Sequence, residues 1–228
     1  AHVYVIGVGG VGSWAAEGLA RTGVGRITLV DLDVLVESNI NRQLPALDST
    51  LGESKIEAMA TRLRQINPNL ELYVVDDFLT ADNVQQILPS KEEVADLADQ
   101  GKNVIVLDCV DDMNAKLALA LHCRFNKIKL IVSGGAGGKI DPTQIKVADL
   151  TDVTQDPLLA KLRNKLKEKN ISQSKGKFGI KCIYSTEQLK MATACESGLN
   201  CGGYGSAVAV TSVVGMVMVS ECLRLITK

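Results

Sequence analysis

Aromatic residues are scarce in this sequence, making up only 4% of its 228 residues. The smaller side chains of Val, Ile, Leu and Ala must therefore fill the core. The sequence also lacks an excess of charge of either sign, because Lys and Arg nearly balance Asp and Glu and give a formal net charge of -1. This balance excludes a general electrostatic attraction to nucleic acid, so any polyanion binding requires a local basic patch.

No two of the six cysteines are spaced C-x-x-C, which excludes the paired knuckles of a structural zinc site. Their spacing does not suggest a disulfide scaffold either, and we expect reduced thiols and no zinc. The chain opens at Ala1, without a starting Met, directly on a strand pattern. It shows no basic, apolar and cleavage regions of a signal peptide, and we expect a cytoplasmic protein.

Strand and helix patterns alternate along the first part of the chain. Apolar runs predict strands at residues 2–7, 26–31, 70–75, 103–108 and 129–133, and helices at 10–23, 55–67, 80–88 and 115–125. This alternation predicts an α/β fold with a Rossmann-like, doubly wound and mostly parallel sheet. The charged residues 91–102 are expected to form a surface insertion.

The pattern changes after residue 138. We expect a strand at residues 144–147, a basic helix that starts at Asp156 and Pro157, and a long apolar helix at residues 206–226. The most apolar part of the last helix, residues 206–219, has about 14 residues, fewer than the roughly 20 that span a bilayer. Core or dimer packing is therefore favoured for it, with peripheral membrane contact as the alternative.

A glycine-rich turn, GVGGVGS at residues 7–13, joins the first predicted strand to the first predicted helix. Glycines let the backbone approach a phosphate, and the helix start offers unpaired N–H groups and the positive end of its dipole. Asp31 lies 19 residues beyond Gly12, at the end of the second strand, where a carboxylate reaches ribose hydroxyls. This arrangement predicts a nucleotide site and leaves NAD and ATP as alternatives.

A polar stretch after the second strand, DLDVLVESNINRQ at residues 31–43, favours ATP. An NAD-binding domain needs no cation-bearing loop there, whereas Arg42 can bind phosphate oxygens in a bidentate fashion. Lys55, at a helix start, adds a second positive charge that can neutralise the triphosphate as pyrophosphate leaves. Asp111, in DCVDD at residues 108–112, is placed to hold magnesium, which prefers oxygen ligands.

Together, GVGGVGS, DLDVLVESNINRQ, the Lys55 of GESK and DCVDD resemble the ubiquitin-activating-enzyme-like superfamily, whose members adenylate carboxylates. The resemblance implies an ATP-binding adenylation domain at residues 1–138, with residues 139–228 as a C-terminal extension packed on the same domain. It implies catalytic roles for Arg42, Lys55 and Asp111, with magnesium at Asp111. The family motif usually ends in Asp-Asn, whereas this chain has Asp112. The implied nucleotide-binding residues are Gly7, Gly9, Gly10, Gly12, Asp31, Asp33, Ser38, Asn39, Asn41, Arg42, Lys55, Asp111 and Asp112.

Three further segments closely resemble the family of tRNA threonylcarbamoyladenosine dehydratases. They are RLRQINP before VVDDF (residues 62–78), SGGAGGKIDPTQ (residues 133–144), and TQDPLLAKLR followed by SKGK (residues 154–177). This resemblance implies that ATP adenylates the threonylcarbamoyl carboxylate on a tRNA adenosine, and that ring closure then gives a net dehydration.

Other functions remain as alternatives at this point. An adenylyltransferase for the C-terminal glycine of a ubiquitin-like sulfur carrier is one, although such enzymes usually carry the C-x-x-C pairs that this chain lacks. An NAD(P)-dependent oxidoreductase is favoured only by the glycine loop. A catalytically silent scaffold is the fourth interpretation.

Partners are predicted from the C-terminal extension and from the superfamily. Basic residues there are candidate tRNA contacts, with a solvated helix face as the alternative: Lys161, Arg163, Lys165, Lys175 and Lys177. Cys201 is either a thiol that accepts sulfur or an acyl group, as from a sulfur-relay partner, or a small residue in a glycine-rich turn, which we favour. The superfamily also implies a homodimer in which an N-terminal Arg enters the partner's ATP site, and no residue here can be assigned to that role.

Overall fold

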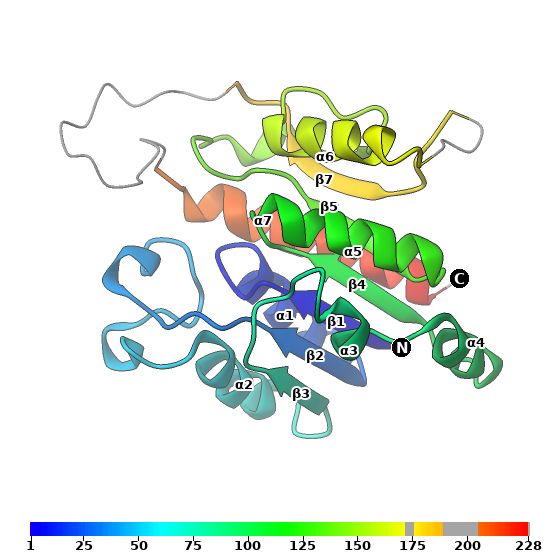
Figure 1. Cartoon of the computed structure of the whole chain (residues 1–228). Coiled ribbons are helices and arrows are strands. Elements are labelled where there is room, and N and C mark those ends of the chain that lie inside the picture. The colour runs from blue at the N-terminus through cyan, green and yellow to red at the C-terminus, as the bar shows by residue number, and fades with distance from the viewer. Residues whose placement is uncertain (172–175, 189–204, 228) are drawn as a thin grey trace.

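The computed structural model describes residues 1–171, 176–188 and 205–227 (Figure 1). Its described part contains one sheet of seven strands in the order β3-β2-β1-β4-β5-β7-β6. All neighbouring strands are parallel except β6 and β7, which pair antiparallel. The strands are β1 (His2–Ile6), β2 (Arg26–Val30), β3 (Glu71–Val75), β4 (Val104–Asp108), β5 (Lys129–Ser133), β6 (Ile145–Asp149) and β7 (Lys181–Ser185).

Helices cover both faces of this sheet (Figure 1). One face carries α1 (Gly12–Arg21), α2 (Lys55–Ile66) and α7 (Val208–Ile226), and the other carries α3 (Val84–Ile87), α4 (Lys91–Asp99), α5 (Met113–Phe125) and α6 (Pro157–Glu168). Short 3-10 turns are η1 (Glu37–Asn39), η2 (Asp48–Thr50) and η3 (Pro142–Gln144). The predicted doubly wound, Rossmann-like α/β fold is confirmed.

The central strands have continuous apolar sequences because their side chains alternate between two buried faces of the sheet. In β1, Val3 and Val5 belong to the core under α1, α2 and α7, whereas Tyr4 and Ile6 belong to the core under α5 and α6. Both faces of a doubly wound sheet are buried, so neither set of positions is polar. The strand order reverses between β1 and β4, and the carboxyl ends of these two strands are where such folds bind ligands.

Two elements differ from the sequence-based expectations. Residues 91–102 lie at the surface as expected, but residues 91–99 form a helix, α4, that was not predicted. A capping box explains it, since Ser90 accepts a hydrogen bond from the backbone of Glu93, whose carboxylate accepts one from the backbone of Ser90. The second difference is β7, a buried strand that was not predicted and that lies between β5 and the edge strand β6.

The C-terminal elements join the same sheet as the first predicted domain, and the boundary at residue 138 stays a prediction. Helix α7 has 19 residues and is long and apolar enough to cross a membrane by length and composition, so the length argument against a membrane span was wrong. In this structure α7 packs against α1, β5 and β7. The contact with α1 is close, because a Cβ on Gly18 would lie 2.9 Å from Val219, and one on Gly215 would lie 2.7 Å from the carbonyl of Val11.

Candidate functional site

A pocket of about 770 Å³ opens at the carboxyl ends of β1, β4 and β5. Its lining combines the glycine turn after β1, the polar loop after β2 and the acidic turn after β4. The size is that of a typical small-molecule or cofactor site. The pocket therefore lies where the topology predicts a ligand, and the residues predicted from the sequence can be placed against it.

The glycine turn is built so that its backbone forms one wall of this pocket. Gly7 has a backbone φ of 87°, a value that residues with a side chain rarely adopt. A Cβ on Gly12 would lie only 1.8 Å from the carbonyl oxygen of Gly7. Gly7, Gly9 and Gly10 line the pocket, whereas Gly12 supports the turn from behind. No side chain caps the start of α1 at Val11, so the helix end is open to an anion.

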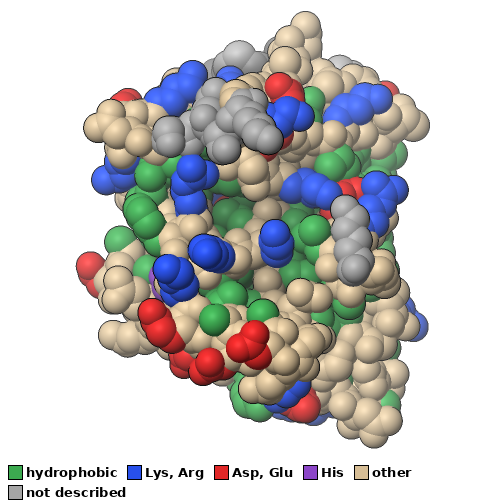
Figure 2. Space-filling model, turned by 90° about the vertical axis from the view of Figure 1, so that its right-hand side faces the viewer, with side chains coloured by type: hydrophobic (Ala, Val, Ile, Leu, Met, Phe, Trp, Pro, Cys, Tyr) green, Lys and Arg blue, Asp and Glu red, His purple; other side chains and the backbone are tan. Residues whose placement is uncertain are grey.

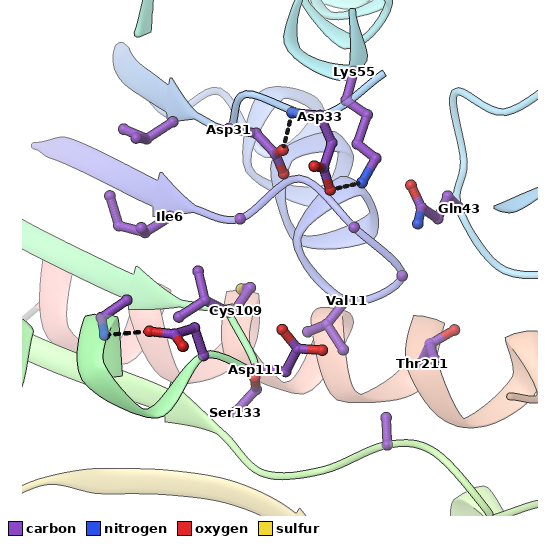
Figure 3. Close-up of a pocket in the computed structure, with 18 of the residues that line it drawn as sticks. Ile6, Val11, Asp31, Asp33, Gln43, Lys55, Cys109, Asp111, Ser133 and Thr211 are labelled. Atoms are coloured by element: carbon purple, nitrogen blue, oxygen red, sulfur yellow. Dashed lines mark hydrogen bonds and ion pairs between the residues drawn. The ribbon is translucent and has the colours of Figure 1, made fainter. Parts of the chain in front are cut away.

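The carboxylate of Asp31 is buried and bonded at both oxygens. Its Oδ2 accepts from the backbone N–H of Val8 at 2.6 Å, and its Oδ1 accepts from the N–H of Asp33 at 2.9 Å. Asp31 therefore ties the glycine turn to the loop after β2. Next to it, Lys55 donates to Asp33 Oδ2 at 2.6 Å. Both ions lie on the side of the glycine turn opposite Asp111 and Cys109 (Figure 3).

Arg42 lines the pocket from a loop that α1 holds in place. Its Nη1 donates to the carbonyl of Ser38 at 2.7 Å and to Asn41 Oδ1 at 3.0 Å. Trp14 Nε1 donates to the Arg42 carbonyl at 3.0 Å, so the first turn of α1 fixes this segment. Ser38 and Asn41 are therefore supports of Arg42 and do not line the pocket, unlike Asn39.

Asp111 and Asp112 lie in the turn between β4 and α5, and both line the pocket. Asp112 caps α5, because its Oδ1 accepts from the backbone N–H of Ala115 at 2.8 Å. Asp111 is exposed, and Figure 3 places it near Val11 and Ser133. In the described residues no three His, Cys, Asp or Glu side chains group to hold a metal alone. One or two carboxylates fit Mg²⁺ that is also held by the phosphates of a nucleotide.

A buried ion pair supports this turn and was not predicted. Lys116 Nζ lies 2.9 Å from Asp108 Oδ1 and donates to the carbonyl of Ser133 at 3.0 Å, and both side chains are fully buried. Burial raises the pKa of Asp108, and the Lys116 charge opposes that rise. The pair joins the ends of β4 and β5. A signal was present in the sequence, since Lys116 interrupts the apolar face of α5.

Other pocket residues were also missed. Gln43 is buried, and its Oε1 has no hydrogen-bond partner among the described residues. Phe78 and Thr80 line the pocket from the loop after β3, and residues 133–137 line it from the loop after β5. These loop residues carry no charge, and only the fold brings them to the site.

The cysteines in the described part of the chain lie in surroundings that disfavour the reactive thiolate form. Burial raises the pKa of Cys109, Cys123 and Cys182, and raises that of Cys222 to about 12, so these thiols stay protonated at neutral pH. Cys109 lines the pocket and contacts Met218 at 3.8 Å between sulfur atoms. Cys201, the thiol that the sequence singled out, lies outside the described residues.

The predicted RNA contacts are not all alike. Lys161 and Lys177 are exposed and Lys165 is half-buried, whereas Arg163 Nη1 donates to the carbonyls of Leu150, Thr151 and Val153 and so holds the loop before α6. Lys175 lies outside the described residues. Figure 2 shows Lys and Arg side chains spread over the upper part of one face, above a group of Asp and Glu.

The fold and the pocket define a Rossmann-like domain whose pocket is lined by a glycine turn, a buried aspartate and two cations. The chain belongs to the ThiF family, whose model matches residues 1–228. Among curated proteins, tRNA threonylcarbamoyladenosine dehydratase of Escherichia coli (strain K12) is 46% identical over 98% of this chain and 85% of the relative. The protein of that name from Haemophilus influenzae is 42% identical over 100% of this chain and 86% of the relative.

Solved structures agree with these relatives. The crystal structure of E. coli tRNA N6-threonylcarbamoyladenosine dehydratase in complex with ATP has a TM-score of 0.83 and 47% identity, and it covers 100% of this chain and 86% of that one. The molybdopterin-synthase adenylyltransferase of Haemophilus influenzae is 33% identical over only 58% of this chain and 49% of its own length. The sulfur-carrier alternative is therefore the more distant similarity.

Proposed function

We propose that this protein uses ATP to adenylate the threonylcarbamoyl carboxylate on a tRNA adenosine and then closes the ring. One observation carries the proposal: a single pocket brings together the glycine turn, Asp31, Arg42, Lys55 and Asp111. The relatives that match nearly the whole chain bear the name of this dehydratase. A structure with 47% identity contains ATP.

In the first step, the glycine turn and the open end of α1 bind the phosphates, and Asp31 accepts hydrogen bonds from the ribose. A carboxylate oxygen of the substrate forms a bond to the α-phosphorus, while the bond from that phosphorus to the pyrophosphate oxygen breaks. Arg42 and Lys55 stabilise the charge that develops on the leaving pyrophosphate. The carboxylate thereby gains AMP as a leaving group in place of oxide.

In the second step, a nitrogen of the ureido group on the same substituent attacks the activated acyl carbon. The carbon–oxygen bond to AMP breaks, and the nitrogen loses its proton. The original carboxylate oxygen leaves on AMP, so the nucleoside has lost the elements of water. The nucleophile is tethered to the electrophile and gains from proximity, so this step needs no enzyme thiol.

Magnesium and the further partners belong to this proposal. Bound Mg²⁺ would stabilise phosphate charge, and Asp111 is the residue that would hold it at the nucleotide. The tRNA would contact the exposed lysines near α6, and its use as substrate implies a cytoplasmic protein. A homodimer and a sulfur-relay partner are implied only by the superfamily resemblance. Contact of α7 with a membrane stays an alternative prediction.

Mass spectrometry of nucleosides tests the function. Threonylcarbamoyl-modified tRNA is incubated with the protein, ATP and magnesium, and the modified adenosine is expected to lose one water only when ATP is present. An unchanged nucleoside from protein that still binds ATP would contradict the proposal. In that case, ATP–pyrophosphate exchange driven by a small protein ending in Gly-Gly would identify a sulfur-carrier adenylyltransferase.

A further inference from the structure

The pocket has a second glycine-rich wall, residues 134–138, which we call the second glycine loop. It follows β5 and lines the pocket with Gly134, Gly135, Ala136 and Gly137. The residues expected to bind the nucleotide lie mainly on the β1 and β2 side, and Asp111 lies between them and Ser133 (Figure 3). This leaves the side of the second glycine loop open to a carboxylate that approaches the α-phosphate.

The buried carboxylate of Asp156 contacts the loop. Its Oδ2 accepts from the backbone N–H of Gly135 at 2.9 Å. The approach is so close that a Cβ on Gly134 would lie 2.2 Å from this oxygen. The same oxygen lies 3.9 Å from the ammonium of Lys139, just beyond the loop, and both side chains are almost completely buried. Asp156 thus contacts the start of the loop and the residue that directly follows it.

The other oxygen of Asp156 has a separate task. Oδ1 accepts from the backbone N–H of Leu159 at 2.9 Å and caps α6. Leu158, in the first turn of α6, also lines the pocket. The carboxylate therefore fixes the second glycine loop against the helix whose exposed side carries Lys161. An N-cap alone requires neither full burial nor the second oxygen.

We propose that Asp156 is a positioning residue, which holds the second glycine loop in the conformation that admits the substrate carboxylate to the nucleotide. Asp156 does not touch the reacting atoms and acts through the loop backbone. This inference rests on the proposed function for its substrate. Its structural part, the anchoring of the loop, stands on the contacts alone.

The two tasks of Asp156 can be separated by substitution. Ser is also a good N-cap, so Asp156→Ser keeps an acceptor for the N–H of Leu159, but a single hydroxyl cannot also hold the N–H of Gly135. Lys139 would then lose the charge of Asp156 and keep the Ser185 carbonyl at 3.2 Å and the charge of the buried Glu187. The double variant Asp156→Ser/Lys139→Met removes the lysine charge. Ser90→Ala is the matched control, because it removes the N-cap of α4, a helix whose residues do not line the pocket.

The experiment measures steady-state kinetics on modified tRNA together with hydrogen–deuterium exchange. We expect both Asp156 variants to lose about 10- to 100-fold in kcat, the cost of misplacing a reactant by about 1 Å, with KM for ATP changed less than about twofold. Amide exchange in residues 134–138 should become faster in both. Ser90→Ala should change neither kcat nor exchange in this loop.

Two results would overturn the inference: wild-type kcat in the double variant, or unchanged exchange of residues 134–138 in both Asp156 variants. A wild-type protein that leaves modified tRNA unchanged would contradict the proposed function instead. The exchange measurement needs no substrate and still decides whether Asp156 anchors the loop. The failure of one proposal is therefore distinguishable from the failure of the other.

Discussion

Lys55 and Asp33, which both line the pocket, form an ion pair of 2.6 Å. The Lys55 side chain is only 7% exposed, whereas that of Asp33 is 52% exposed. The pair thus compensates a buried ammonium while leaving its acidic partner open to solvent. An incoming phosphate can replace Asp33 as the partner of Lys55 without moving a buried carboxylate. The ion pair with Asp33 therefore holds the Lys55 ammonium at the place where the triphosphate is expected to bind.

Replacing Lys55 with Met keeps the apolar stem and removes the charge. We expect ATP binding to weaken about 10- to 100-fold, because hydrogen bonds to charged groups contribute about 1.5–3 kcal/mol. Isothermal titration calorimetry measures the change. Lys91→Met, on exposed helix α4, is the control and should bind ATP as wild type does. Equal affinity in both variants would exclude Lys55 from the ATP site.

Asp111→Asn is expected to keep the fold and much of the ATP binding but to lose most turnover. The side chain is exposed and not needed for a cap, so the amide should fit without cost to stability. It lacks the charge with which the carboxylate would hold magnesium. Pyrophosphate release at saturating ATP and modified tRNA measures the effect. Turnover close to wild type would remove Asp111 from the mechanism.

Gly12→Ala should abolish ATP binding and destabilise the protein, because its Cβ would lie 1.8 Å from the Gly7 carbonyl oxygen. Gly25→Ala is a matched substitution, since no atom lies within 4 Å of a Cβ there. It should be neutral or stabilise the fold by about 0.4–1 kcal/mol. Urea unfolding and ATP titration of both variants provide the comparison. Wild-type binding by Gly12→Ala would show that the turn has another conformation.

Lys116→Met should lower the free energy of unfolding by about 3–5 kcal/mol, because it leaves the buried Asp108 carboxylate without its ion-pair partner. Asp108→Asn in the same chain removes the second charge. The double variant is therefore expected to be more stable than Lys116→Met alone. Chemical unfolding of the wild type, both single variants and the double variant measures the coupling. A double variant as unstable as the sum of the single variants would show that the two ions act independently.

The stability of the protein should depend on His2 between pH 6.5 and pH 4. Burial, and then the charge of Arg26, lower the pKa of His2 from 6.5 to about 4, and the ring bonds to Thr28 Oγ1 at 2.8 Å. In that window the unfolded chain binds a proton that the folded protein does not, so stability falls as pH falls. His2→Gln should flatten this dependence in urea unfolding at pH 6.5 and 4.5. An unchanged pH dependence would show that His2 does not titrate in this way.

Sequence patterns were sufficient to predict those features that depend only on a short segment of the chain. The glycine turn, Asp31, Arg42, Lys55 and Asp111 each follow an identifiable strand, and the parallel fold brings the ends of β1, β2 and β4 together. The alternation of helix and strand predicted a parallel, doubly wound sheet, whereas the order of its strands comes from the structure. Helix α6 was recognisable from its Asp-Pro start, because Asp156 caps the helix and Pro157 takes its first position.

Other features depend on contacts between distant segments, which no local pattern contains. The role of Asp156 requires that the loop after β5 and the start of α6 lie together, and that of Lys116 requires a buried partner eight residues earlier. Arg163 reads as a basic surface residue, yet it bonds three carbonyls of the preceding loop. Helix α4 was missed for another reason: its charged composition outweighed the capping pair of Ser90 and Glu93.

Helix α7 bears on how the chain folds during synthesis. The elements that it packs against, including α1, β5, β6 and β7, all precede it in the chain. While the ribosome is still making α7, one apolar face of the sheet near β5 is uncovered. Gly18 on α1 then also lacks its contact with Val219 of α7. Until α7 docks, this face is the kind of exposed apolar surface that makes a folding intermediate prone to aggregation.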